Sequence, residues 1–181
     1  MTSSDNIRNS KIELENIYFW TATINKWQKL LENDAFKTVV IESLSFLSSK
    51  KLIDVFSFVI MPNHIHLIWR MNKFNGKELP SASLLKFSAH KFKQMLPRDE
   101  LRKYWVDRLN KQYEFWQRDS LAIELYTPKV AYQKLDYIHL NPLGEQWNLV
   151  TDPCDYEYSS ASFYEKGDHN YSFLKHLGEE F

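Results

Sequence analysis

The sequence predicts an α+β fold in which helices pack against an antiparallel sheet. Three observations predict it: apolar residues at helical spacing, runs of β-branched and aromatic residues, and their order along the chain, β-α-β-β-α-β-α. The 181 residues suffice for one domain with a substantial core. We expect residues 1–12 to be a flexible N-terminus, residues 13–165 to form the domain and residues 166–181 to be a C-terminal tail.

The first half of the chain contains three predicted strands and one helix. The segment "IYFWTATI" at 17–24 is rich in residues that favour strands. Asn33 or Asp34 can cap a helix that runs to about Lys51, because apolar residues recur there at three- and four-residue steps. "DVFSFVIM" at 54–61 and "HIHLIWRM" at 64–71 then predict two strands joined by a Pro-Asn turn.

The second half predicts two further helices. Ser81 or Ser83 can cap one that runs to about Met95, before a proline interrupts the pattern. "YEFWQRD" and "LAIELYT" indicate extended segments around residues 113–127. Thr127, followed by a proline at the first helical position, begins a helix that ends near Asn141.

The composition is that of a folded protein of the cytoplasm. Hydrophobic residues make up 44% of the chain, and the single cysteine, Cys154, excludes an internal disulfide and a cysteine-based metal cluster. The first 16 residues are polar, so secretion is not expected, and no apolar run has the length of about 18 residues that a membrane span needs.

The charges cancel in total but are unevenly distributed. Residues 86–118 contain nine Lys or Arg and four Asp or Glu, whereas residues 139–181 contain two Lys and eight acidic residues. The basic segment also carries aromatic residues, and this combination suits a nucleic-acid strand, whose phosphates attract cations and whose bases stack on rings. The alternative is a solvated pair of helices with its own aromatic core.

Two histidines stand out in the apolar segment "MPNHIHLIW". Because side chains alternate along a strand, His64 and His66 project from one face while Ile65 and Leu67 project from the other. Two imidazoles so placed can reach one metal ion, although they can also be polar residues of an exposed sheet face. Position 68 is an isoleucine where the histidine-triad nucleotide hydrolases have a third histidine, which excludes that class. The sequence also lacks the HExxH motif of zinc proteases, so a protein of that class is not expected.

The helix "KVAYQKLDYIHLNPL" offers further candidate residues. Tyr137 and Asn141 are four residues apart and therefore lie on one face of the helix. If this helix crosses the sheet near the histidines, the Asn141 amide oxygen can be a third ligand and the Tyr137 hydroxyl can point at a group bound there. A tyrosine at this spacing can equally be a core residue.

Together, "MPNHIHLIW" and "LDYIHLNPL" resemble the HUH single-tyrosine transposases, in particular the REP-associated tyrosine transposases and their insertion-sequence relatives. "EFWQRD" and "YEYSS" resemble further stretches of this family, so the resemblance spans about residues 17–160 in the right order. Two segments depart from the family pattern: "LGEQW" after Pro142 and "RDSLAIELYTP" at 118–128.

The resemblance implies a fold, an activity and a set of site residues. The fold is a ferredoxin-like or RRM-like antiparallel sheet with helices packed on one face, of the HUH endonuclease type. The activity is that of a DNA transposase, a single-stranded DNA endonuclease and ligase acting at hairpin-marked ends through a 5′-phosphotyrosine intermediate. Tyr137 would be the nucleophile, and His64, His66 and Asn141 would bind Mg²⁺ or Mn²⁺.

The expected partner is single-stranded or hairpin DNA, bound by a monomer or homodimer in the prokaryotic cytoplasm, in association with the nucleoid. The residues expected to contact nucleic acid are Lys86, Lys91, Lys93, Arg102, Lys103, Trp105, Arg108, Trp116 and Arg118. Two alternatives remain: a catalytically inactive relative that binds hairpin DNA, and a metal-dependent phosphodiesterase that uses water.

Overall fold

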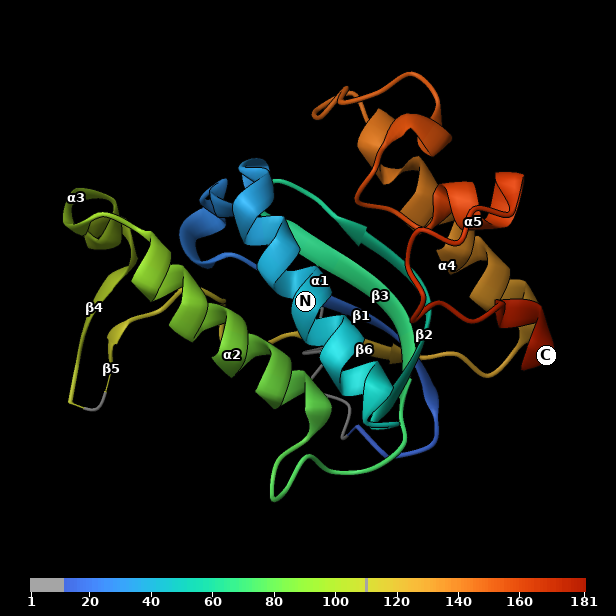
Figure 1. Ribbon diagram of the computed structural model, residues 1–181, viewed down its shortest axis with the longest axis horizontal. Coiled ribbons are helices and arrows are strands. Elements are labelled where there is room, and N and C mark those ends of the chain that lie inside the picture. The colour runs from blue at the N-terminus through green and yellow to red at the C-terminus, as the bar shows by residue number, and fades with distance from the viewer. Residues whose placement is uncertain (1–11, 110) are drawn as a thin grey trace, which may run out of the picture.

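Four strands form an antiparallel sheet in the order β2-β3-β1-β6, and helices lie against it (Figure 1). The computed structural model describes residues 12–109 and 111–181. The sheet strands are β1 (Ile17–Thr23), β2 (Ile53–Ile60), β3 (His64–Met71) and β6 (Leu121–Glu124). A separate two-stranded ribbon consists of β4 (Trp105–Arg108) and β5 (Lys111–Tyr113). The α-helices are α1 (Asp34–Ser49), α2 (Pro80–Met95), α3 (Arg98–Leu101), α4 (Pro128–Leu140) and α5 (Ala161–Lys166). Short 3-10 helices are Asn25–Trp27, Leu30–Glu32, Arg102–Tyr104, Asn141–Leu143, Pro153–Asp155 and Leu177–Glu179.

One face of the sheet packs against α1 and α2 and forms the larger core. Trp20, Leu67 and Trp69 are fully buried in it, together with Leu44 of α1 and Phe92 of α2. The apolar residues that alternate with the histidines in β3 therefore face these two helices, as their spacing predicts.

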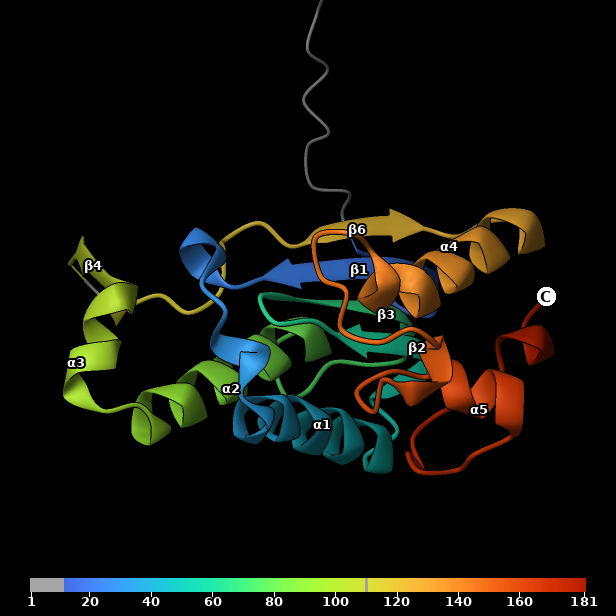
Figure 2. The ribbon, with the colours of Figure 1, turned by 90° about the horizontal axis from the view of Figure 1, so that it is seen from above.

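The opposite face of the sheet packs against α4 and forms a second, smaller core. Ala131, Leu135 and Ile138 of α4 are buried there with Val59 of β2 and Ile68 of β3. Figure 2 shows α4 on the other side of the sheet from α1 and α2. The predicted α+β class with an antiparallel sheet is confirmed. The expectation that the helices pack on one face is wrong for α4, because the histidine face has apolar residues of its own.

Three helix starts follow from local chemistry. Asn33 caps α1 by accepting a hydrogen bond from a backbone amide at 2.9 Å, and Thr127 caps α4 ahead of its proline, both as predicted. The predicted caps of α2 are wrong: α2 begins at Pro80 without a side-chain cap, because proline at the first position has no amide hydrogen to satisfy.

The segment expected to form a C-terminal tail, residues 166–181, lies against the domain. Phe173 and Leu177 are buried in the larger and smaller core, respectively. The Lys175 amide donates to the Val55 carbonyl of β2 at 2.9 Å. This segment is therefore packed along β2 at the edge of the sheet.

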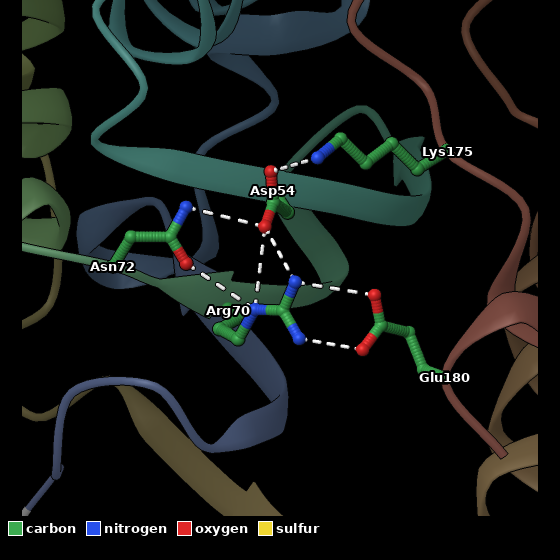
Figure 3. A network of polar contacts seen from close by, with 5 residues as sticks. All are labelled: Asp54, Arg70, Asn72, Lys175 and Glu180. Atoms are coloured by element: carbon green, nitrogen blue, oxygen red, sulfur yellow. Dashed lines mark hydrogen bonds and ion pairs between the residues drawn. The ribbon is translucent and has the colours of Figure 1, made fainter.

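A network of charged side chains also joins this segment to the sheet (Figure 3). Arg70 donates to Asp54 at 2.7 Å and to both carboxylate oxygens of Glu180 at 2.5 and 3.1 Å. Lys175 forms a second ion pair with Asp54 at 2.6 Å. Burial raises the pKa of Asp54, but hydrogen bonds from Lys175, Arg70 and Asn72 outweigh burial and hold the pKa below its usual value.

The predicted flexible N-terminus, residues 1–12, lies outside the described residues apart from Ile12. Over the described ranges, no helix has the length and apolarity needed to cross a membrane.

Candidate active site

His64 and His66 of β3 lie side by side on the sheet face that α4 partly covers. Their ring centroids are 4.6 Å apart, with an angle of 71° between the ring planes. Both side chains are buried, which removes water from their nitrogens. The predicted arrangement, two histidines projecting from one face, is therefore present, and the structure encloses it.

Each imidazole is held through its Nδ1 atom. His64 Nδ1 lies 2.7 Å from Asn63 Oδ1, and His66 Nδ1 lies 2.7 Å from Thr21 Oγ1 on the neighbouring strand β1. The Asn63 amide oxygen can only accept, so Nδ1 of His64 donates to it and Nε2 of His64 carries the lone pair. His66 Nε2 is buried and has no hydrogen-bond partner among the described residues, so it is available to a ligand.

Burial keeps both histidines neutral at pH 7. It lowers the pKa of His64 to about 4, and the hydrogen bond between His64 and the Asn141 side chain acts in the opposite direction. Burial also lowers the pKa of His66 to about 3, and the charges of His64 and Lys134 lower it further. Neutral imidazoles are the form that coordinates metal ions.

Helix α4 brings Tyr137 to the histidines. Its ring centroid lies 5.3 Å from that of His66 and 5.9 Å from that of Phe19, which itself stacks on His66 at 5.2 Å. Tyr137 is 49% exposed, so the residue is accessible to a substrate while its ring contacts His66 and Phe19. Asn141, at the end of the same helix, reaches His64.

These donors fit a divalent metal ion. His64, His66 and Asn141 would supply two imidazole nitrogens and one amide oxygen, and the buried, unpartnered Nε2 of His66 is a coordination position without another use. Over the part of the chain that the structure describes, no three His, Cys, Asp or Glu side chains form a metal cluster, so an amide is the third donor on offer. The roles of the four predicted site residues remain predictions, although the structure brings them together.

Sequence reasoning missed four residues that border the site. Thr21 and Phe19 belong to β1, whose register pairs Thr21 with His66. Lys134 lies one turn before Tyr137 on α4, with its Nζ 4.6 Å from the Phe19 ring centroid. Trp147 comes from the segment "LGEQW" and lies 5.9 Å from His64 between ring centroids, with its Nε1 buried and unpartnered among the described residues. Of these four residues, only Lys134 could have been found from the sequence, because it is three residues before Tyr137 and therefore lies on the same side of the helix.

The predicted nucleic-acid residues lie mostly around α2 and the β4–β5 ribbon, at the other end of the molecule from α4 (Figure 1). A cavity of about 710 Å³ lies between α2 and this ribbon, and its lining includes Lys93, Trp105 and Arg108. Trp105 is 49% exposed, so its ring is accessible. Further out, Lys86, Arg102 and Lys103 form ion pairs with acidic residues three to eight positions away in the sequence, and Lys91 lies over the ring of Phe87.

A cluster of cations surrounds one buried carboxylate beside this cavity. Arg108, Lys111 and Arg118 lie 3.3 to 3.4 Å from Glu114 Oε1, which leaves a surplus of positive charge at the surface. The chain next to this cluster contacts the sheet beside the candidate site. The Gln117 amide donates to the carbonyl of Thr23 in β1, and Thr23 pairs with His64 in β3. The cations thus lie next to the strand that leads to the histidines.

The prediction for Trp116 is wrong. Its side chain is only 5% exposed, and its Nε1 donates to Ser88 Oγ of α2 at 2.9 Å. A ring packed among Phe92 and its neighbours is part of the core and has no face to offer to a base.

Comparison with solved structures finds a REP-associated tyrosine transposase bound to a REP hairpin. It superposes with a TM-score of 0.61 over 84% of this chain and 81% of that chain, at 16% sequence identity. A crystal structure of a Deinococcus radiodurans R1 protein assigned as a transposase aligns over 73% of this chain and 95% of that chain, at 12% identity and a TM-score of 0.44. No protein-family model and no curated protein matches the sequence. The first similarity shows that the chain has the fold of the REP-associated transposase, as the resemblance in its motifs implies.

Proposed function

We propose that this protein is a single-tyrosine transposase of the HUH type, which cleaves and rejoins single-stranded DNA at hairpin-marked ends. The observation that carries the proposal is the convergence of His64, His66, Tyr137 and Asn141 on one face of the sheet. These residues come from motifs about 70 residues apart, and the fold is that of a protein described as a tyrosine transposase bound to a REP hairpin.

The chemistry would be a transesterification at phosphorus. The Tyr137 hydroxyl oxygen attacks the scissile phosphate, so that a bond from oxygen to phosphorus forms and the bond to the 3′-oxygen breaks. The phenolic proton passes to solvent, and the departing 3′-oxygen takes up a proton to give a free 3′-hydroxyl. The 5′-phosphotyrosine keeps the energy of the phosphodiester, so a second 3′-hydroxyl can reseal the strand without ATP.

Tyrosine is a weak nucleophile at neutral pH, because its phenol has a pKa of about 10. A divalent ion, Mg²⁺ or Mn²⁺, when held by His64, His66 and Asn141, supplies Lewis acidity to the phosphate. Asn63 and Thr21 hold the two imidazoles in orientation through their Nδ1 atoms.

The basic region would bind the DNA backbone. Lys93 and Arg108 offer cations at the cavity between α2 and the ribbon, Arg118 offers one beside the residue that bonds to β1, and Trp105 offers an exposed ring for a base. A hairpin stem fits this picture because its phosphates meet the surplus positive charge around Glu114. The ribbon and α4 lie at opposite ends of the molecule (Figure 1), so in this proposal the stem is held at the ribbon while a single strand extends to Tyr137.

The test is the formation of a covalent adduct. A single-stranded oligonucleotide with a hairpin and a 3′-end label is incubated with the protein and Mn²⁺ or Mg²⁺, and the label is followed on a denaturing gel. Wild-type protein should retain the label covalently, Tyr137→Phe should retain none, and Tyr132→Phe, the same change at an exposed tyrosine of α4, should behave as wild type.

Two outcomes separate the alternatives. Cleavage that survives Tyr137→Phe would falsify the assignment of Tyr137 as the nucleophile and indicate a phosphodiesterase that uses water. Tight hairpin binding without cleavage in either metal would indicate an inactive binding protein.

A further inference from the structure

Lys134 is a charged residue of the candidate site to which the proposed mechanism gives no role. It lies three residues before Tyr137, on the same side of α4. Its Nζ atom is 5.7 Å from the centroid of the Tyr137 ring and 4.6 Å from that of Phe19. Phe19 stacks on His66, so the ammonium group lies against the rings that flank the histidine.

No carboxylate neutralises this charge among the described residues. Lysines elsewhere in the chain do form ion pairs: Lys37, Lys86, Lys103, Lys111 and Lys175. The described contacts of Lys134 are with aromatic faces, which attract a cation without using its hydrogen-bond donors. The three N–H groups therefore remain available to an anion.

Along α4, Lys134 comes before Tyr137 and Asn141 comes after it. Asn141 lies one turn after Tyr137 and Lys134 lies about one turn before it, which corresponds to rises of about 6 Å and 4.5 Å along the helix axis. Asn141, at the C-terminal end of α4, forms a hydrogen bond with His64. A phosphate bound at Tyr137 would thus have Lys134 on the preceding turn of the helix and Asn141 on the following turn.

We propose that Lys134 is a catalytic residue that donates a hydrogen bond to a non-bridging oxygen of the scissile phosphate. The proposal rests on the proposed function, since it assigns a substrate atom of the same reaction. A diester phosphate carries one negative charge, and attack by the Tyr137 oxygen increases the negative charge on the non-bridging oxygens. A fixed ammonium group in a partly water-excluded site stabilises this charge more in the transition state than in the ground state.

The first measurement is the single-turnover rate of adduct formation with saturating oligonucleotide and Mn²⁺. Lys134→Met keeps the length and apolar stem of the side chain and removes its charge, and it should lower the rate by about 10²- to 10³-fold, the loss seen when one such donor is removed. Lys134→Arg should stay within about tenfold of wild type, since a guanidinium also binds phosphate. Lys129→Met, the same change at an exposed position of the same helix, should leave the rate unchanged.

The second measurement needs no catalysis. Binding of the oligonucleotide is measured by fluorescence anisotropy against salt concentration, with each change placed in the uncleaving Tyr137→Phe background. One lost phosphate contact on a single strand should reduce the slope of log affinity against log salt by about 0.7 for Lys134→Met. Lys134→Arg and Lys129→Met should keep the slope of the parent.

The outcomes separate this inference from the proposed function. A wild-type protein that forms no adduct contradicts the proposed function, and the salt slope then decides the Lys134 contact alone. If wild type forms the adduct and Lys134→Met reacts equally fast, Lys134 is not catalytic. A slower rate with an unchanged slope overturns the phosphate contact and indicates that Lys134 only positions the rings of Phe19 and Tyr137. Circular dichroism spectra that match wild type confirm that each variant is folded.

Discussion

Ser160 connects the helix that carries the candidate nucleophile to the sheet. Its Oγ atom lies 2.9 Å from Nε2 of His139 on α4, 2.8 Å from the Ser57 hydroxyl and 3.1 Å from the Phe58 amide of β2. All four residues are buried. Replacement of Ser160 by alanine removes this shared partner and changes the side-chain volume little.

The expected loss of stability follows from the groups left without a partner. Burial lowers the pKa of His139 to about 4, so its ring is neutral at pH 7 and its Nε2 needs a neutral partner. Ser160→Ala leaves this nitrogen and the Phe58 amide buried and unpaired, at about 1–3 kcal/mol each, or about 2–6 kcal/mol in total. Ser160→Ala should therefore lower the free energy of unfolding by at least about 2 kcal/mol.

Equilibrium unfolding in urea, followed by far-UV circular dichroism at pH 7, measures this loss. Ser162→Ala is the matched control, because the Ser162 hydroxyl has no described hydrogen bond and the residue lies two positions further along the chain. The midpoint should fall for Ser160→Ala with an unchanged m value. A difference between the two variants of less than about 0.5 kcal/mol, the size of an ordinary surface change, would refute the reasoning.

Three further predictions concern charge, stacking and metal. Because the folded pKa of Asp54 lies below its unfolded value of about 4, its contribution to stability is complete above the unfolded pKa and is lost as the pH falls from there through the folded pKa. Thermal melts should therefore fall more steeply over this range for wild type than for Asp54→Asn. Trp105→Ala should weaken oligonucleotide binding by about 1–3 kcal/mol in anisotropy titrations, whereas Leu109→Ala, an exposed neighbour, should not. Calorimetric titration should show Mn²⁺ binding lost in His66→Ala and kept in His90→Ala.

The local elements of the fold could be predicted because their signals are local. The bounds of β3, His64–Met71, coincide with the predicted strand, since alternation and a turn on one side define it. The start of α4 after Thr127 follows from a cap and a proline. The β4–β5 ribbon was not predicted, because short exposed strands show little apolar periodicity.

Within the site, spacing predicted which residues share a face but not what surrounds them. His64 and His66 follow from strand alternation, and Tyr137 and Asn141 from helical spacing. The Thr21 hydroxyl at His66 depends on the register between β1 and β3, which brings together residues 45 positions apart. Such a pairing is set by the packing of the whole sheet and leaves no mark in either segment alone.

Trp116 shows that the composition of a segment does not predict the burial of each residue in it. Its position in a basic, aromatic segment predicted an exposed ring, whereas the structure buries it against α2 with its Nε1 bonded to Ser88. Composition averages over a segment, but burial is decided residue by residue. In the same segment Trp105 is half exposed, so one stretch supplies both a core residue and a candidate stacking residue.

The geometry of the site depends on how α4 is rotated about its own axis. One residue corresponds to about 100° of rotation, so a helix turned by one position would carry the Tyr137 hydroxyl away from the histidines. Leu135 and Ile138, buried against the second face of the sheet, determine the rotation, and the bond from His139 to Ser160 reinforces it. Because Tyr137 is half exposed, its own side chain adds little to this anchoring. The nucleophile can therefore be replaced at little cost to stability, whereas changes to its buried neighbours on α4 would lower stability and activity together.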